Sequence, residues 1–86
     1  MAEEKIGIIT HYFGKIGVAA LKITEGELKV GDTIHIKGHT SDFMQAVESM
    51  QVEHESVASA RIGDEIGLKV ADVAREHDLV YKVVPD

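Results

Sequence analysis

The sequence has 86 residues, of which 44% are hydrophobic and 28% are charged. This size and composition are typical of one small globular domain and argue against a disordered chain. The net charge is −6 and cysteine is absent, which disfavours broad affinity for a phosphate backbone and excludes a disulfide framework. No stretch has the apolar core of a signal peptide or the length of a membrane span. We expect one domain over residues 4–84 in a cytoplasmic protein without a membrane partner.

Alternating apolar and polar residues, separated by Gly-rich polar segments, predict six short strands in chain order. In the second strand Ala19, Leu21 and Ile23 share one face, and in the third Ile34 and Ile36 do so, while His35 and Lys37 face outward. The predicted strands span residues 5–13, 18–23, 33–37, 43–53, 65–70 and 79–84. Residues 72–77 carry the only helical propensity.

The fourth predicted strand is irregular. Its apolar residue Val47 is followed by Met50, which leaves a gap of three in a pattern of period two. An extra residue in a strand indicates a β-bulge, which we expect near Glu48 and Ser49. Bulges bend strands, and so small an open sandwich would leave long free edges. We therefore predict an all-β fold, a small closed six-stranded β-barrel.

Two stretches, residues 28–36 and 60–68, share one pattern: a basic residue, a β-branched residue, Gly-Asp, and then alternating apolar residues. Gly adopts positive φ at little cost and Asp can hydrogen-bond its own backbone, so each Gly-Asp pair predicts a tight turn that starts a strand. The two glycines, Gly31 and Gly63, are 32 residues apart. We interpret the two copies as pseudo-symmetry within one β domain; a coincidence of common turn chemistry is the alternative.

Four motifs, in this order and spacing, resemble the second domain of translation GTPases such as elongation factor Tu and bacterial initiation factor two. They are Gly-Lys-x-Gly-Val-Ala-Ala at 14–20, Gly-Glu-Leu-Lys-Val-Gly-Asp-Thr-Ile at 26–34, Val-Glu-Ser-Met-Gln at 47–51 and Ala-Arg-Ile-Gly-Asp-Glu-Ile-Gly-Leu at 60–68. The resemblance implies the six-stranded closed barrel of that domain. The chain has neither the phosphate-binding Gly-x-x-x-x-Gly-Lys-Ser/Thr loop nor an Asn-Lys-x-Asp motif, so we expect no GTP binding by this chain alone. The family also carries a Gly before its last strand, where this chain has Asp78.

In that family the loops of the barrel contact ribosomal RNA, and the resemblance implies a contact surface here. The loop that matches the family's Gly-Arg-x-Gly has Lys in place of Arg, and a basic residue also occurs in the family where Arg61 stands. Lys lacks the planar fork of Arg, so an RNA contact there would be weaker. We add the loop that follows the third predicted strand. The predicted partner or RNA contacts are Gly14, Lys15, Gly17, Lys37, His39 and Arg61.

Residue types that serve metal or catalytic chemistry are present but are not arranged for it. His35 and His39, if both lay on one strand, would be about 13 Å apart, too far for one ion. His39, Ser41 and Asp42 share one loop, whereas catalytic triads are assembled from separate elements. We therefore predict no metal, no cofactor and no enzymatic activity.

Two further groups of side chains have an ordinary and a functional interpretation. The acidic residues around His54 are typical of a solvated strand edge. The aromatic residues Tyr12, Phe13 and Phe43 stand near predicted strand ends, where one or two should enter the core. One of them could instead stack on a ligand at the mouth of the barrel.

These observations favour a non-catalytic interaction module that binds a protein or RNA partner through its loops. The alternative is an accessory or oligomerisation barrel that acts with a separately encoded enzyme, such as a collagenase-like peptidase. A small ligand-binding or enzymatic barrel is a third and weaker hypothesis.

Overall fold

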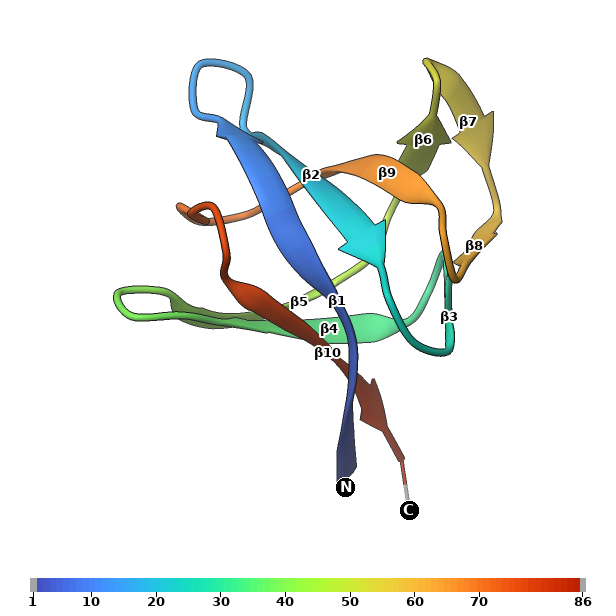
Figure 1. The fold of residues 1–86 in the computed structure, drawn as a ribbon, viewed down its shortest axis with the longest axis horizontal. Coiled ribbons are helices and arrows are strands. Elements are labelled where there is room, and N and C mark those ends of the chain that lie inside the picture. Colours follow the sequence, from blue (N-terminus) through green and yellow to red (C-terminus); the bar gives the residue numbers. More distant parts are fainter. Residues whose placement is uncertain (1, 86) are drawn as a thin grey trace.

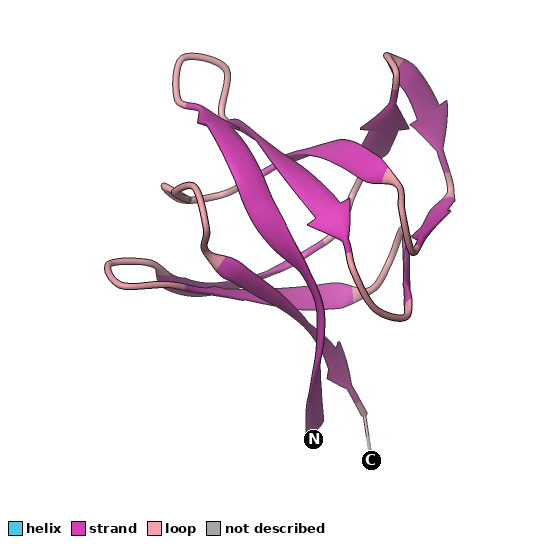
Figure 2. Cartoon of the chain, viewed as in Figure 1, coloured by secondary structure: helices cyan, strands magenta, loops and turns pink. Residues whose placement is uncertain are grey.

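A computed structural model describes residues 2–85 and shows an all-β fold (Figure 1, Figure 2). The strands are β1 (Ala2–Phe13), β2 (Val18–Ile23), β3 (Glu27–Lys29), β4 (Thr33–Lys37), β5 (Asp42–Ala46), β6 (Met50–Val52), β7 (Glu55–Val57), β8 (Ser59–Arg61), β9 (Glu65–Lys69) and β10 (Leu79–Val84). Residues 2–85 contain no helix, including over 72–77 where we expected one, and so none that could cross a membrane.

Eight strands form one antiparallel sheet in the order β5-β4-β10-β1-β2-β9-β6-β7, and β3 and β8 form a separate ribbon. The sheet curls, but β5 and β7 remain at its two ends, so the predicted closed six-stranded barrel is wrong. A side chain bridges β5 and the end of β9 where a barrel would have a main-chain ladder. The Nε2 atom of Gln45 donates to the carbonyl oxygen of Lys69 at 2.8 Å, and its Oε1 accepts from the amide of Ala71 at 2.6 Å.

The predicted fourth strand, residues 43–53, is two strands that pair with different partners. β5 pairs with β4, whereas β6 pairs with β9 and β7. Between them the buried Val47 accepts a hydrogen bond from the amide of Gly31 at 2.9 Å and donates to the carbonyl of Asp32 at 2.8 Å. The slip in the pattern therefore marks a change of partner strand and not a bulge. The register shifts lie in β1 instead, between residues 5 and 7 and between residues 9 and 11.

The two Gly-Asp pairs form equivalent turns, as predicted. Gly31 and Gly63 have φ of 100° and 95°, values that glycine adopts without strain. Asp32 accepts a hydrogen bond from the amide of Lys29 through its side chain, and Asp64 does the same for the amide of Arg61. The segments before the turns, β3 and β8, pair with each other in the register Glu27 to Arg61 and Lys29 to Ser59. A pseudo-twofold axis thus passes between the two copies.

The core lies inside the curl and takes one face of each main strand. The buried hydrophobic residues are Ile6, Ile9, Ala19, Leu21, Ile23, Leu28, Ile34, Ile36, Val47, Met50, Ala60, Ile66, Leu68, Ala74 and Val80. They include the inward positions predicted for the second and third strands. Tyr12 and Phe43 pack against this cluster, whereas Phe13 is 46% exposed.

Two glycines are required because other atoms occupy the space of a side chain. A Cβ on Gly7 of β1 would lie 2.2 Å from the carbonyl oxygen of Lys22 and 2.8 Å from Cδ1 of Leu21. A Cβ on Gly38 would collide with the carboxylate of Asp78, which is buried and accepts a hydrogen bond from the amide of Arg75 at 2.9 Å.

The turn before β10 is made without glycine. His77 takes the positive φ, 74°, one residue before Asp78, near which the resemblance led us to expect Gly. Its amide donates to the carbonyl of Ile9 at 2.8 Å, and the amide of Ile9 donates to the carbonyl of Asp78 at the same distance. These two bonds attach the segment before β10 to the middle of β1.

Candidate functional site

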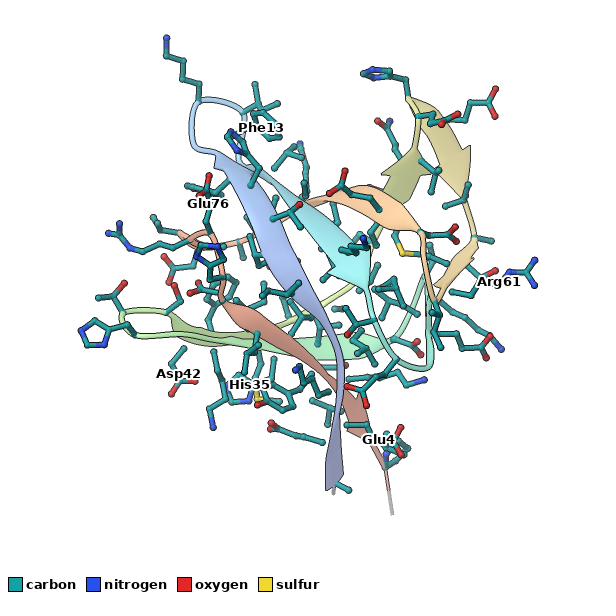
Figure 3. The ribbon with its side chains drawn as sticks, in the orientation of Figure 1. Glu4, Phe13, His35, Asp42, Arg61 and Glu76 are labelled. Carbon is teal, nitrogen blue, oxygen red and sulfur yellow. The ribbon has the colours of Figure 1, made fainter. Side chains whose placement is uncertain are left out.

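The structure places the predicted contact residues in three separate parts of the fold. Gly14, Lys15 and Gly17 lie in the β1–β2 turn. Lys37 and His39 lie at and after the end of β4, and Arg61 ends β8 at the far side of the molecule (Figure 3). The fold does not bring them together as one surface. Contact of these residues with a partner stays a prediction.

A different site stands out, which we call the hairpin groove. It is a hollow of about 420 Å³ lined by residues of the β1–β2 hairpin, the β6–β7 hairpin and β9. In the ribbon, β9 runs between the two hairpins (Figure 1). Its apolar lining consists of Phe13, Ile16, Val18, Ala20, Ile66 and Gly67. Its polar lining consists of Gln51, Glu53, His54 and Glu65. Mostly apolar hollows of this size with a few polar groups are typical of binding sites.

The groove exists because small residues form its floor. Ala20 of β2 pairs directly with Gly67 of β9, which pairs in turn with Gln51 of β6. Val18 and Ala20 alternate with the buried Ala19 and Leu21, so the floor belongs to the face of the sheet opposite the core. Larger side chains surround this floor, and they leave it as a depression.

One wall of the groove is aromatic and aliphatic. Phe13, opposite Val18 in the register, is 46% exposed, and Ile16 at the hairpin tip is 64% exposed. The ring centroids of His11 and Phe13 are 4.4 Å apart, and Nδ1 of His11 lies 3.2 Å from a carboxylate oxygen of Glu76 (Figure 3). The contacts from Glu76 through His11 to Phe13 favour one position of the Phe13 ring at the rim.

Carboxylates line another part of the groove. Glu65 accepts a hydrogen bond from the hydroxyl of Thr10 at 2.8 Å, which fixes one oxygen of its carboxylate. Thr10 is the extra residue at the second register shift of β1, and bulges of this kind re-aim side chains. Lys22 of β2 pairs with Glu65 of β9, next to the pair of Ala20 and Gly67 that forms the floor. The lining itself contains two glutamates and neither lysine nor arginine.

The tip of the β6–β7 hairpin is the third part of the groove. Val52 pairs with Glu55, so Glu53 and His54 form a two-residue turn. Their φ values are 50° and 67°, the conformation in which Asn-Gly is preferred and side chains with Cβ are disfavoured. The acidic run of the sequence therefore includes a strained turn that faces the groove.

A second polar cluster, which we call the His35 clasp, ties three strands together. His35 of β4 places Nδ1 2.8 Å from a carboxylate oxygen of Glu3 in β1 and Nε2 2.5 Å from one of Asp42 in β5 (Figure 3). Two hydrogen bonds raise the pKa of His35: the one to Asp42 has the larger effect and the one to Glu3 the smaller. The same contact lowers the pKa of Asp42. With the His35 side chain only 13% exposed, the clasp braces the sheet.

The residues that the sequence suggested for catalysis and metal binding do not assemble into such a site. Ser41 is buried, and its hydroxyl donates to the carbonyl of Val73 at 3.4 Å. Asp42 binds His35 of the clasp. Across residues 2–85 no group of three or more potential ligands is placed to hold a metal ion.

Solved structures identify the class of fold. Two crystal structures of the C-terminal domain of a Geobacillus thermoleovorans protein assigned to the U32 peptidases, one of them a selenomethionine variant, superpose with TM-scores of 0.84 and 0.87. They cover 90% and 94% of this chain and 96% and 93% of their own chains, at 20% identity. The chain therefore has the fold of a U32 peptidase C-terminal domain.

Sequence relatives agree with that class. An uncharacterised protease of Methanocaldococcus jannaschii is 37% identical over 78 residues, which cover 90% of this chain and 19% of that protein. A collagenase of Porphyromonas gingivalis is 38% identical over 72 residues, which cover 83% of this chain and 20% of that protein. The chain thus spans about a fifth of the length of these relatives. No protein-family model matches the chain.

These findings overturn the resemblance to the second domain of translation GTPases. The similar proteins are peptidases, and the described sheet is not the closed barrel that the resemblance implied. The quoted motifs encode backbone features: a hairpin turn with Gly17 at positive φ and two Gly-Asp turns at Gly31 and Gly63. Tight turns demand the same residue types in any curled sheet of this size, so the motifs indicate geometry and not a role in translation.

Proposed function

We propose that this chain is a non-catalytic accessory module that acts with the catalytic part of a collagenase-like peptidase. The observation that carries the proposal is the partial match to long relatives. Most of this chain aligns with about a fifth of proteins named protease or collagenase, and the matching fold is a C-terminal domain. The remaining four fifths of such a protein leave room for the catalytic residues elsewhere.

The arrangement of polar groups supports a role without catalysis. A nucleophile of the Ser-His-Asp type needs one ring nitrogen of histidine for the hydroxyl and the other for a carboxylate. In the His35 clasp both ring nitrogens face carboxylates, those of Glu3 and Asp42. No nitrogen of this histidine is left to activate a nucleophile. We expect the module to act in the cytoplasm, as the absence of cysteine suggested.

A chimera tests the proposal. In the Porphyromonas gingivalis collagenase, the matched segment is replaced by this chain, and collagen hydrolysis is compared with that of the parent and of a protein that lacks the segment. We expect the chimera to exceed the truncated protein in rate, and the isolated chain to hydrolyse nothing. A folded chimera that is no faster than the truncated protein would contradict the proposal, as would hydrolysis by this chain alone.

A further inference from the structure

We infer that the hairpin groove docks an extended polypeptide segment in which a basic side chain is flanked by apolar ones. The inference rests on the proposed function, because an accessory module of a peptidase has polypeptide within reach. Two residues of the groove differ from what their backbone conformation favours. Both differences cost stability, and each gives the groove a property that a ligand would need.

The first is Gly67 on the floor. It lies in the interior of β9 without a positive φ, and an added Cβ would meet only Cγ1 of Val18, at an ordinary 3.7 Å. Neither backbone geometry nor packing requires glycine here, unlike at Gly7. Glycine weakens a strand interior, where it often marks a bulge, a tight bend or a place at which a ligand or another backbone approaches closely. At this position its effect is to keep the floor open.

The second is the turn of Glu53 and His54. Both residues have positive φ in a two-residue hairpin that favours Asn-Gly. Within one groove, the sequence thus has glycine at position 67, where a side chain would fit, and has Glu53 and His54 in a turn whose backbone favours glycine. Departures from local preference are enriched at functional sites, and two of the three non-glycine residues with positive φ in residues 2–85 lie in this groove, the third being His77. Here the strained turn brings a carboxylate to the rim.

The charge and the hydrogen bonding of the groove define its occupant. The lining has two carboxylates, Glu53 and Glu65, and one oxygen of Glu65 accepts a hydrogen bond from Thr10. Lys22, opposite Glu65, and Lys69, opposite Val18, lie beside the lining, but the chain as a whole has a net charge of −6. These charges favour a cation. β2 and β9 are both paired on two sides, so an added strand has no free ladder to join there. Recognition must come from side chains: an apolar anchor on the floor and a cation at the carboxylates.

The test uses fluorescein-labelled heptapeptides and this chain, with affinity measured by fluorescence anisotropy. The reference peptide has one arginine between two leucines. One control replaces the arginine with citrulline, its neutral isostere, and another replaces both leucines with glycine. We expect the reference peptide to bind about tenfold more tightly than either control. Binding of the reference peptide should weaken as salt rises from about 0.02 to 0.15 M, because the pairing is partly exposed.

Four variants locate the binding. Gly67→Ala should raise the melting temperature and yet weaken peptide binding, a combination that a purely structural glycine would not give. Glu65→Gln should reduce the preference for arginine over citrulline. Ile16 and Ile62 are both 64% exposed, but only Ile16 lines the groove, so Ile16→Ala should weaken binding and Ile62→Ala should not.

Equal binding of all three peptides, or a Gly67→Ala variant that is more stable and binds unchanged, would overturn the inference. The outcomes separate from those of the collagenase chimera. Peptide binding with an inactive chimera would retain the groove and reject the peptidase role. An active chimera whose rate does not change with Gly67→Ala, together with peptides that do not bind, would reject the groove alone.

Discussion

Substitution of Gly7 by alanine should separate the two strands at the centre of the sheet. The new Cβ would lie 2.2 Å from the main-chain oxygen of Lys22, whereas real contacts of this kind stay beyond 3.0 Å. Because the nearest atom belongs to the main chain and not to the end of a flexible side chain, the two strands must move apart by about 0.8 Å. Overpacking of this kind costs about 1–3 kcal/mol and a weakened ladder bond about 1 more. We expect a loss of about 3 kcal/mol.

A domain of this length has roughly 4–13 kcal/mol of stability in total, so this loss is a large part of it. Thermal unfolding followed by circular dichroism should show a melting temperature about 12–24 °C lower, at about 4–8 °C per kcal/mol. Gly67→Ala is the matched control in the same sheet, and it should raise the melting temperature by about 2–8 °C. A Gly7→Ala protein that melts within about 2 °C of the parent would refute the described approach of β1 and β2.

Three further variants test other features of the fold. Leu28→Ala, at the pseudo-twofold ribbon where Leu28 is fully buried, should cost about 2–5 kcal/mol in urea unfolding. His54→Gly should add about 1 kcal/mol in the same assay, because it relieves the positive φ of the turn. The raised pKa of His35 adds stability that is complete below the unfolded value of 6.5 and is lost as pH rises through the folded value. His35→Asn should flatten this decline in melting temperature, and an unchanged profile would contradict the clasp.

Local chemistry made much of the fold readable from the sequence. The Gly-Asp turns at Gly31 and Gly63 and the strands over 18–23, 33–37 and 79–84 agree with the structure because alternation and turn residues act over a few neighbours. Whether the sheet closes into a barrel could not be predicted from the sequence, because closure depends on contacts between residues that are distant in the chain. The amide of Gln45 bridges the place where a barrel would close, and nothing in its neighbourhood announces that role.

The candidate site was largely missed for the same reason. The sequence drew attention to basic loop residues such as Lys15 and Arg61, which the fold separates. The groove is assembled from three segments that are far apart in the chain, and only its aromatic residue Phe13 and the acidic run beside His54 attracted notice. The signal that could have found it is Gly67, a glycine within the alternating pattern of a predicted strand.

The pairing of β1 with β10 has a consequence for synthesis of the protein. Ala2 lies opposite Val84 in the register, and Ile8 opposite Leu79, so the centre of the sheet joins residues from opposite ends of this sequence. Such long-range pairing gives a high contact order and slow folding. While the chain emerges from the ribosome, β1 can pair with β2, but its other edge must wait until β10 is made. Until then this apolar edge is open to aggregation, which makes chaperone binding most useful at that stage.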